Sequence, residues 1–251
     1  MPETETVLRT LLGVAVLAGI TTAVLGAARV PHRTASALAI LRGAIQLALL
    51  GVVLSGVITD ARWVALALLV MTGVAAVTAS RRLGGLRRHL GLVATSMLAG
   101  ILTSLLVVFA TGAIALSPRY ALAIGGIVIG NAMTTATLAG RRVTQAADDR
   151  WDQIEGWLAL GATPRRATLD VARHGLREAV IPSIDQTRTT GLVTLPGAFV
   201  GAIFGGISPL EAGRFQIVVL AAIMTTGAIT AALVAFRLAP TARRGDAAVA
   251  R

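Results

Sequence analysis

The polar side chains of this sequence that could bind a ligand interrupt otherwise apolar segments. Arg42 and Gln46 stand four residues apart in one such segment, so a helix would carry both on the same face. Because a charge inside a bilayer is costly, we expect Arg42 to face other helices or water, where it could pair with an acid such as Asp185. Alternatively, its long stem lets the guanidinium reach the membrane surface. Together Arg42 and Gln46 suggest a polar face toward a translocation path.

Four other polar residues are candidates for the same path. Asp185 and Gln186 precede an apolar segment, and their oxygen atoms are suitable ligands for a transported metal cation, although capping of the next helix is an equal alternative. Asn131 lies inside an apolar segment and Gln216 at the start of another. Each can line the path or form a hydrogen bond between helices.

A glycine repeat follows these residues. Gly197, Gly201 and Gly205 recur at every fourth position, which places them on one face of a helix. Such a face permits close packing of helices, within the chain or across a dimer axis, or it forms a mobile gate. Pro196 directly before the repeat introduces a kink and frees a backbone carbonyl one turn earlier. The gate candidates are therefore Thr190, Thr194 and the backbone around Pro196.

Several kinds of chemistry are absent from the sequence. It has no Cys, which excludes disulfides and thiolate metal sites, and all 23 basic residues are Arg, which excludes the lysine-dependent Walker A motif. His32, His89 and His174 have no metal-ligand spacing, so no metal ligands can be assigned. There is no HExxH or G-x-S-x-G motif either. We expect a non-catalytic chain that binds no cofactor of its own.

The elements that would position these residues are membrane spans. With 251 residues, 55% of them apolar, and a mean hydropathy of +0.77, the sequence predicts an all-α polytopic membrane protein. The first segment could instead be a signal peptide, but its length and the acidic Glu3 and Glu5 favour a retained span. We expect about seven transmembrane helices, at residues 10–28, 35–59, 63–79, 90–116, 120–140, 189–207 and 215–236.

The net charge of +11 is distributed between the loops of this layout. Alternate flanks and loops hold 18 arginines against 4, which predicts an N-terminus outside and a C-terminus in the cytoplasm of a cell-membrane protein. This alternation argues against nucleic-acid binding, because the charge does not gather in one patch. The stretch 141–188 carries eight of the arginines and is expected to be a cytoplasmic loop.

Two short amphipathic helices are predicted in this loop. The first begins near Ala147, carries the apolar stripe of Trp151, Ile154 and Leu158, and ends at Gly161 as its C-cap. Acidic residues occupy its early turns, where negative charge suits the helix dipole: Asp148, Asp149, Asp152 and Glu155.

The second helix is predicted to begin at Thr163 and Pro164, which suit the N-cap and the first helical position. Pro182 is expected to stop it. Leu169, Ala172, Leu176 and Ala179 would form its apolar side. Such a hairpin can lie on the membrane surface with its arginines against anionic lipid, or it can be a docking surface for another protein.

Residues 155–162 resemble the EAA loop of ABC-transporter permeases, with an acidic residue six positions before a glycine. Gly156 and Trp157 depart from the Ala-Ala of the general pattern. In such permeases the loop forms a coupling helix that sits in a groove of the ATPase subunit. The resemblance implies that coupling involves Trp151, Glu155, Gly161, Ala162 and Thr163.

A longer run, residues 179–199, resembles the signature of FetB-type permeases, a family that includes bacterial iron exporters and plant permeases linked to aluminium tolerance. The likeness continues at 201, 205–212 and 214–216. It also appears upstream at 41–42, 46–47 and 130–133, so it covers about residues 35–236.

This resemblance implies the permease subunit of an ABC transporter. Two copies would form the path, and two separate P-loop ATPase subunits would bind ATP and Mg²⁺ and dock on residues 141–188. The implied cargo is iron or a related metal, exported from the cytoplasm. Two alternatives stay open: an ATP-independent carrier or channel with a regulatory cytoplasmic loop, and a membrane anchor or assembly subunit.

Overall fold

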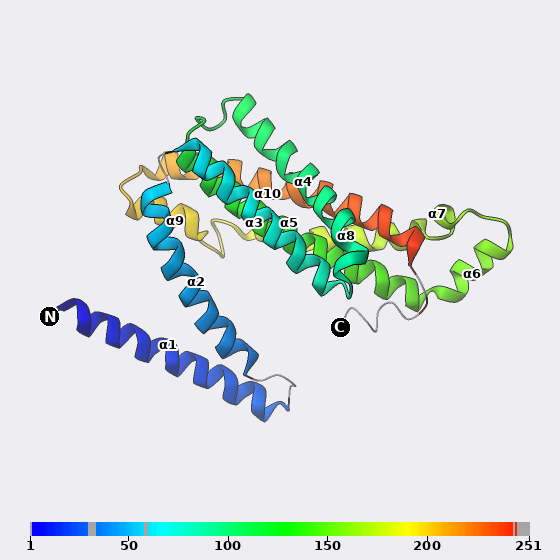
Figure 1. Ribbon diagram of the computed structural model, residues 1–251, viewed down its shortest axis with the longest axis horizontal. Coiled ribbons are helices and arrows are strands. Elements are labelled where there is room, and N and C mark those ends of the chain that lie inside the picture. The colour runs from blue at the N-terminus through cyan, green and yellow to red at the C-terminus, as the bar shows by residue number, and fades with distance from the viewer. Residues whose placement is uncertain (1, 30–33, 58–59, 243, 245–251) are drawn as a thin grey trace. The chain divides into compact units, whose positions relative to one another are not determined.

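The computed structural model describes residues 2–29, 34–57, 60–242 and 244, and these residues are overwhelmingly helical (Figure 1). The prediction of an all-α fold is confirmed for them. The helices are α1 (Pro2–Ala27), α2 (Ala35–Val57), α3 (Ala61–Arg82), α4 (Leu86–Ala110), α5 (Pro118–Asp149), α6 (Trp151–Ala159), α7 (Pro164–Ala167), α8 (Leu169–Thr189), α9 (Gly197–Phe204), α10 (Pro209–Leu238) and the 3₁₀ helix η1 (Ala239–Thr241).

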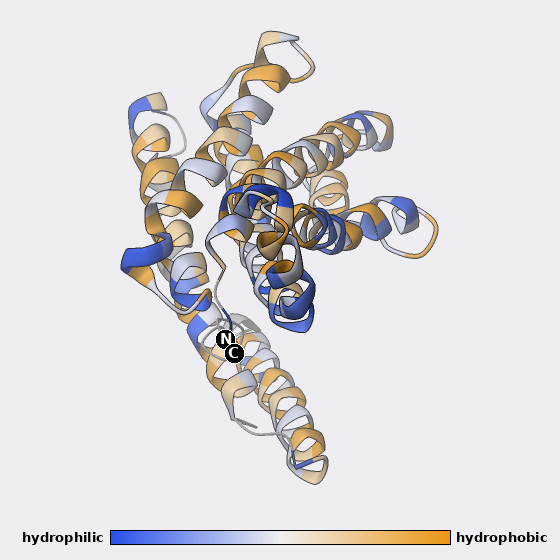
Figure 2. Ribbon diagram, turned by 90° about the vertical axis from the view of Figure 1, so that its right-hand side faces the viewer, coloured by the Kyte–Doolittle hydropathy of each residue, from blue (hydrophilic) through white to orange (hydrophobic). Residues whose placement is uncertain are grey.

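Five stretches of the described helices are long and apolar enough to cross a membrane: Glu5–Ala27, Ala61–Arg82, Leu86–Ala110, Pro118–Asp149 and Pro209–Thr241. The apolar part of α2 with described side chains is Ala35–Ala48. Figure 2 shows apolar colouring along most of the helices, with hydrophilic residues at many helix ends. The chain is therefore a multi-pass membrane protein, with five candidate spans where the sequence predicts about seven.

The chain divides into two units, Met1–Ile58 and Thr59–Arg251. The first unit consists of α1 and α2, and small residues of both helices, including Ala18, Gly19 and Ala37, line a space of about 810 Å³. Its large apolar side chains are mostly exposed, as expected for helices that face lipid.

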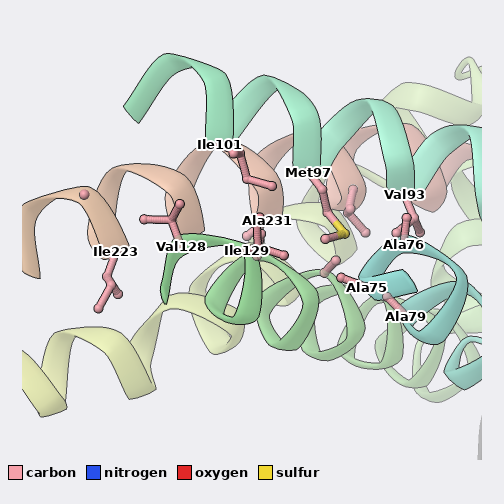
Figure 3. Packing of buried hydrophobic residues seen from close by; sticks show 14 of the residues in the cluster. Ala75, Ala76, Ala79, Val93, Met97, Ile101, Val128, Ile129, Ile223 and Ala231 are labelled. Atoms are coloured by element: carbon pink, nitrogen blue, oxygen red, sulfur yellow. The ribbon is translucent and has the colours of Figure 1, made fainter. Parts of the chain in front are cut away.

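The second unit has a core made by α3, α4, α5 and α10. Figure 3 shows side chains of these four helices meeting: Ala75, Ala76 and Ala79 of α3, Val93, Met97 and Ile101 of α4, Val128 and Ile129 of α5, and Ile223 and Ala231 of α10. Many of these residues are small, which lets the helix backbones approach closely and form van der Waals contacts.

Side-chain caps explain where the long helices begin. Asp60 accepts a hydrogen bond from the backbone N–H of Arg62 at 2.8 Å and caps α3. Ser117 caps α5 and Ser208 caps α10, and in both helices the cap is followed by proline at the first helical position.

The prediction that the first loop helix begins near Ala147 is wrong. α5 continues to Asp149, and the next helix, α6, begins only at Trp151. Burial explains the extension, because Val143 and Ala147 of α5 pack in a second apolar cluster with residues of α8 and α10. Asp148 and Asp149 therefore end a helix, and only Asp152 stands in the first turn of α6.

Pro182 does not stop the second loop helix, contrary to the prediction. α8 continues through it to Thr189, although proline supplies no N–H for the helical hydrogen bond. Ala179 and Ser183, on either side of Pro182, are buried. Their packing holds the helix together across the missing hydrogen bond.

The span predicted at 189–207 is also wrong as a single helix. α8 ends at Thr189, a turn with Gly191 at φ +87° follows, and α9 has only eight residues. Pro196 is the N-cap of α9, and Gly205 is its C-cap. Proline and glycine therefore begin and end a short helix here instead of kinking a long one.

Candidate functional site

α6 projects from the end of α5 and is held to the second unit by one buried side chain. Ile154 is its only buried residue and belongs to the apolar cluster of α5, α7, α8 and α10. Trp151 is half-buried, and its Nε1–H donates a hydrogen bond to Oε1 of Glu155 at 2.6 Å. This contact joins successive turns of α6 and fixes two of the residues predicted for coupling.

A left-handed glycine turn ends α6. Gly161 has φ +84°, its N–H bonds to the carbonyl of Leu158 at 2.9 Å, and the N–H of Ala162 bonds to the carbonyl of Trp157 at 3.0 Å. This pair of hydrogen bonds is a Schellman motif, which satisfies the last free carbonyls of the helix. The helix therefore ends at Gly161 as predicted, with Leu160 as its C-cap and Gly161 as the left-handed residue directly after it.

Thr163 begins the next element as predicted. Its Oγ1 accepts a hydrogen bond from the N–H of Arg166 at 3.4 Å, and Pro164 follows at the first helical position of α7. α7 is a single turn, so the loop consists of two short helices held at a fixed corner. The corner orients α6 relative to α8.

Large apolar side chains at the C-terminal end of α6 are exposed. Trp157 is 51% exposed, Leu158 39% and Leu160 82%. Trp157 and Leu160, three residues apart, share one side, whereas Leu158 lies on the side of Ile154, as the apolar stripe of the sequence predicts, and is the least exposed of the three. Large apolar side chains gathered on a short helix at the polar end of the unit are typical of a surface that another protein covers.

α8 packs along the C-terminal half of α5 and runs antiparallel to it (Figure 1). A Cβ added at Gly175 of α8 would meet Val143 at 2.4 Å, and further along α8 the Ser183 hydroxyl reaches Asn131. Residue numbers thus increase along α8 in the direction in which they decrease along α5, so the two helices are antiparallel. Glycine at 175 lets the two backbones approach closely where the pair begins.

Asn131 joins three helices. Its Nδ2 donates to the carbonyl of Ile223 in α10 at 3.0 Å, and its Oδ1 accepts from the hydroxyl of Ser183 in α8 at 3.4 Å. Gly227 of α10 leaves the room for this amide, because a Cβ there would lie 3.2 Å from Nδ2. Asn131 thus forms the helix–helix hydrogen bonds that were one of its two predicted roles.

A groove of about 240 Å³ lies beside this bridge, between α5 and α8. It brings together two residues predicted for the path, Asn131 and Gln186. The sequence reasoning missed the hydroxyl residues Thr134, Thr135 and Ser183, although the two threonines follow Asn131 at helical spacing. In full, the groove is lined by Gly130, Asn131, Thr134, Thr135 and Leu138 of α5 and by Ala179, Pro182, Ser183 and Gln186 of α8.

The comparisons with known proteins decide the family. The model described as Uncharacterised protein family (UPF0014) matches residues 8–242. The chain belongs to the UPF0014 family. No solved structure gives a significant match to it.

Three curated relatives of this UPF0014 chain carry informative names. The rice "UPF0014 membrane protein STAR2" (Oryza sativa subsp. japonica) is 38% identical over 197 residues, 78% of this chain and 69% of the relative. The Arabidopsis thaliana "Protein ALUMINUM SENSITIVE 3" is 37% identical over 191 residues, 75% and 69% of the two chains. The Escherichia coli "Probable iron export permease protein FetB" is 33% identical over 193 residues, 75% and 74%.

Other predicted path residues of this UPF0014 protein lie outside the groove. Asp185 is exposed on α8, and the hydroxyl of Thr190 donates to the carbonyl of Gln186 at 2.7 Å. Gln216 is buried near the start of α10, and its Oε1 has no hydrogen-bond partner among the described residues. Arg42 and Gln46 belong to the first unit, where both are exposed, one turn apart on α2.

The predicted glycine face is not used for close packing among the described residues. A Cβ at Gly197 or at Gly201 would meet nothing within 4 Å, and Gly205 approaches only carbonyls of its own helix. α9 instead lies at the N-terminal half of α5, where its Ala198 and Ala202 help to line a cavity of about 350 Å³ with Tyr120.

The polar side chains that line the groove are neutral. The described residues contain no group of three or more His, Cys, Asp or Glu side chains placed to hold a metal ion. Hydroxyl and amide groups supply the polar atoms at the groove instead.

Proposed function

We propose that this chain is the permease subunit of an ABC transporter. Two copies form the translocation path, and separate P-loop ATPase subunits bind ATP and Mg²⁺ and dock on the loop of α6 and α7. The chain has no Lys and therefore no Walker A lysine of its own, so hydrolysis belongs to the partner. The proposed cargo is iron or a related metal, exported across the cell membrane, in line with the name of the Escherichia coli relative.

The observation that carries this proposal is the exposed pair of Trp157 and Leu160, three residues apart at the end of α6. The buried Ile154 anchors α6 with Trp151 packed beside it, and the hydrogen-bonded turn at Gly161 ends the helix. A helix of this kind suits a groove on a partner, because its fixed corner transmits a displacement to α8 as a lever. α8 in turn lies against α5 and α10.

The charges of α8 support a path beside it. Residues 120–140 of α5 are uncharged, and at about 1.5 Å per residue they span the roughly 30 Å of a hydrocarbon core. Asn131 lies at their middle, so Ser183, which bonds to it, lies near the bilayer midplane. Asp185 and Arg188 follow on α8 and are both exposed.

Lipid is a poor environment for those two charges. A charged side chain at the centre of a bilayer costs about 2.5–3.5 kcal/mol on insertion scales. Water in a translocation path removes that cost. We therefore assign the exposed face of α8, including Asp185 and Gln186, to the path. The second half of α8, the turn at 190–196 and α9 together take the place of the sixth membrane span that the sequence predicts at 189–207.

Gentle solubilisation of the tagged chain tests the proposal. We expect a P-loop ATPase to co-purify in stoichiometric amount, and the double substitution Trp157→Ala, Leu160→Ala to lower its recovery by about tenfold or more, since interface anchors contribute more than 1 kcal/mol each. Leu106→Ala is the matched control, because Leu106 is similarly exposed but lies on the spanning helix α4. Full recovery with the double variant would reject docking on α6. Purification of the chain alone as a homo-oligomer would favour the ATP-independent carrier.

A further inference from the structure

We propose that the groove between α5 and α8 binds a hydrated hard cation through its water shell. This inference rests on the proposed function and specifies the form in which a metal would pass. It assigns the site to residues of two helices at the middle of the membrane, and it assigns the recognition to neutral oxygen atoms.

The groove presents hydrogen-bond acceptors, and three of the donors among its lining residues are already engaged within the protein. The Thr134 hydroxyl donates to the carbonyl of Gly130 at 3.1 Å, and the Ser183 hydroxyl points its donor at Oδ1 of Asn131. The amide of Asn131 donates to the carbonyl of Ile223. What these groups offer to a ligand is their oxygen lone pairs.

Pro182 adds to this acceptor character. It lines the groove in the middle of α8, where it supplies no N–H, so the carbonyl of Glu178 one turn earlier lacks its helical donor. A wall that offers oxygen acceptors is complementary to the outward-pointing hydrogens of metal-bound water.

The size of the groove fits one such ion. A small divalent cation holds water oxygens at about 2.1 Å, and a water radius of about 1.4 Å gives the hexahydrate a radius of about 3.5 Å and a volume of roughly 180 Å³. The groove measures about 240 Å³. Hydrated passage also suits the residues, since dehydrating such an ion requires charged or strongly coordinating ligands.

Asp185 supplies a negative charge close by. It precedes Gln186, which lines the groove, and it is exposed. Among the described residues Asp185 takes part in no salt bridge, so Arg188, three residues further on, does not neutralise it by direct contact. A lone carboxylate at this depth attracts a cation without coordinating it.

A single cysteine can report on the site, because the chain has none of its own. Gly130→Cys places a thiol at the groove without removing a polar side chain, and a Cβ there meets nothing within 4 Å. Gly91→Cys on α4 is the matched control, since its Cβ is equally unobstructed and it lies outside the groove. The readout is the rate of maleimide labelling of the full chain in its membrane.

The probes are Mg²⁺ and hexaamminecobalt(III), an inert complex that has the shape of a hydrated cation and cannot exchange its ligands. We expect both to slow labelling at Gly130→Cys by about fivefold or more and to leave Gly91→Cys unchanged, because only a thiol beside the bound ion is shielded. Thr134→Val removes one acceptor at nearly constant volume. It should raise the cation concentration needed for protection by about tenfold, the effect of roughly 1.4 kcal/mol.

Three results would overturn the site. Protection by Mg²⁺ without protection by the cobalt complex would mean direct coordination, and a lack of protection by either would mean no cation site. Failure of Gly130→Cys to react at all, while Gly91→Cys reacts, would mean that the groove is closed to water. None of these measurements needs the ATPase, so a complex that retains its ATPase but shows no protection would keep the permease and reject the site.

Discussion

Gly161 holds a backbone conformation that residues with a side chain avoid. Its φ of +84° allows the two hydrogen bonds that end α6. Gly161→Ala should strain this turn by about 1–2 kcal/mol and shift the orientation of α6. We expect recovery of the co-purified ATPase to fall by roughly five- to thirtyfold, which is the factor that such an energy represents.

Gly156→Ala is the control for that prediction. Gly156 lies inside α6, and a Cβ there meets nothing within 4 Å. Alanine is also the residue of the general EAA pattern at this position, and it favours a helix by about 0.5–1 kcal/mol over glycine. ATPase recovery should therefore be kept or raised. Equal losses with both variants would mean that the turn at Gly161 has no special role.

Single residues predicted a structural feature correctly where that feature depends on neighbouring residues alone. The cap at Thr163 and the helix end at Gly161 each depend on a few neighbouring backbone groups, so the sequence was sufficient to find them. Pro182 shows the opposite case. Its helix-breaking tendency is overcome by packing of Ala179 and Ser183, and one sequence does not reveal which segment of the chain they will meet.

At the scale of elements, the contact between α4 and α10 depends on one glycine. A Cβ at Gly100 would lie 2.7 Å from the backbone carbonyl oxygen of Thr226, and the hydroxyl of Thr226 donates to Ser104 at 2.7 Å. Gly100→Ala must push the helices apart, since backbone cannot yield as a side chain can. Overpacking of this kind costs about 1–3 kcal/mol.

The thermal unfolding midpoint of the purified protein in detergent measures this effect. For a chain of this size about 1 kcal/mol corresponds to 2–4 °C, so Gly100→Ala should lower the midpoint by several degrees. Gly91→Ala on the same helix, where a Cβ meets nothing within 4 Å, should leave it unchanged or raise it slightly. An unchanged midpoint for Gly100→Ala would contradict the close approach.

The positions of the helices were easier to predict than the contacts between them. Long apolar runs indicated the helices now seen as α3, α4, α5 and α10, because spanning length and composition are properties of the run itself. Nothing in the sequence indicated that Gly100 would meet Thr226 or that Asn131 would bond to Ile223. The hydroxyl residues of the groove were missed for the same reason, since they acquire meaning only when α8 lies against α5.

For the whole molecule, the main difference concerns the stretch predicted as a loop. The sequence assigned all of 141–188 to the cytoplasm because it is rich in arginine. In the structure, Ser183 of that stretch bonds to Asn131, at the centre of the uncharged part of α5. The first half of α8 keeps the charge of a loop, and its second half lies beside a membrane span. A charge count cannot separate the two halves, since both carry arginine.

Cysteine labelling from each side of the membrane, in the presence of the proposed ATPase partner, tests this division. Arg188→Cys lies about 7.5 Å beyond Ser183, at about 1.5 Å per residue, so in the outward-open state it should react with an impermeant maleimide added outside. Arg173→Cys, in the first half of α8 and also exposed, should react only from the cytoplasm. Leu106→Cys on α4 is exposed to lipid, where the thiol does not ionise, and should react at least about tenfold more slowly from either side. If Arg188→Cys reacted only from the cytoplasm in every nucleotide state, α8 would be a loop helix throughout, and the path would have to be lined by the other spans.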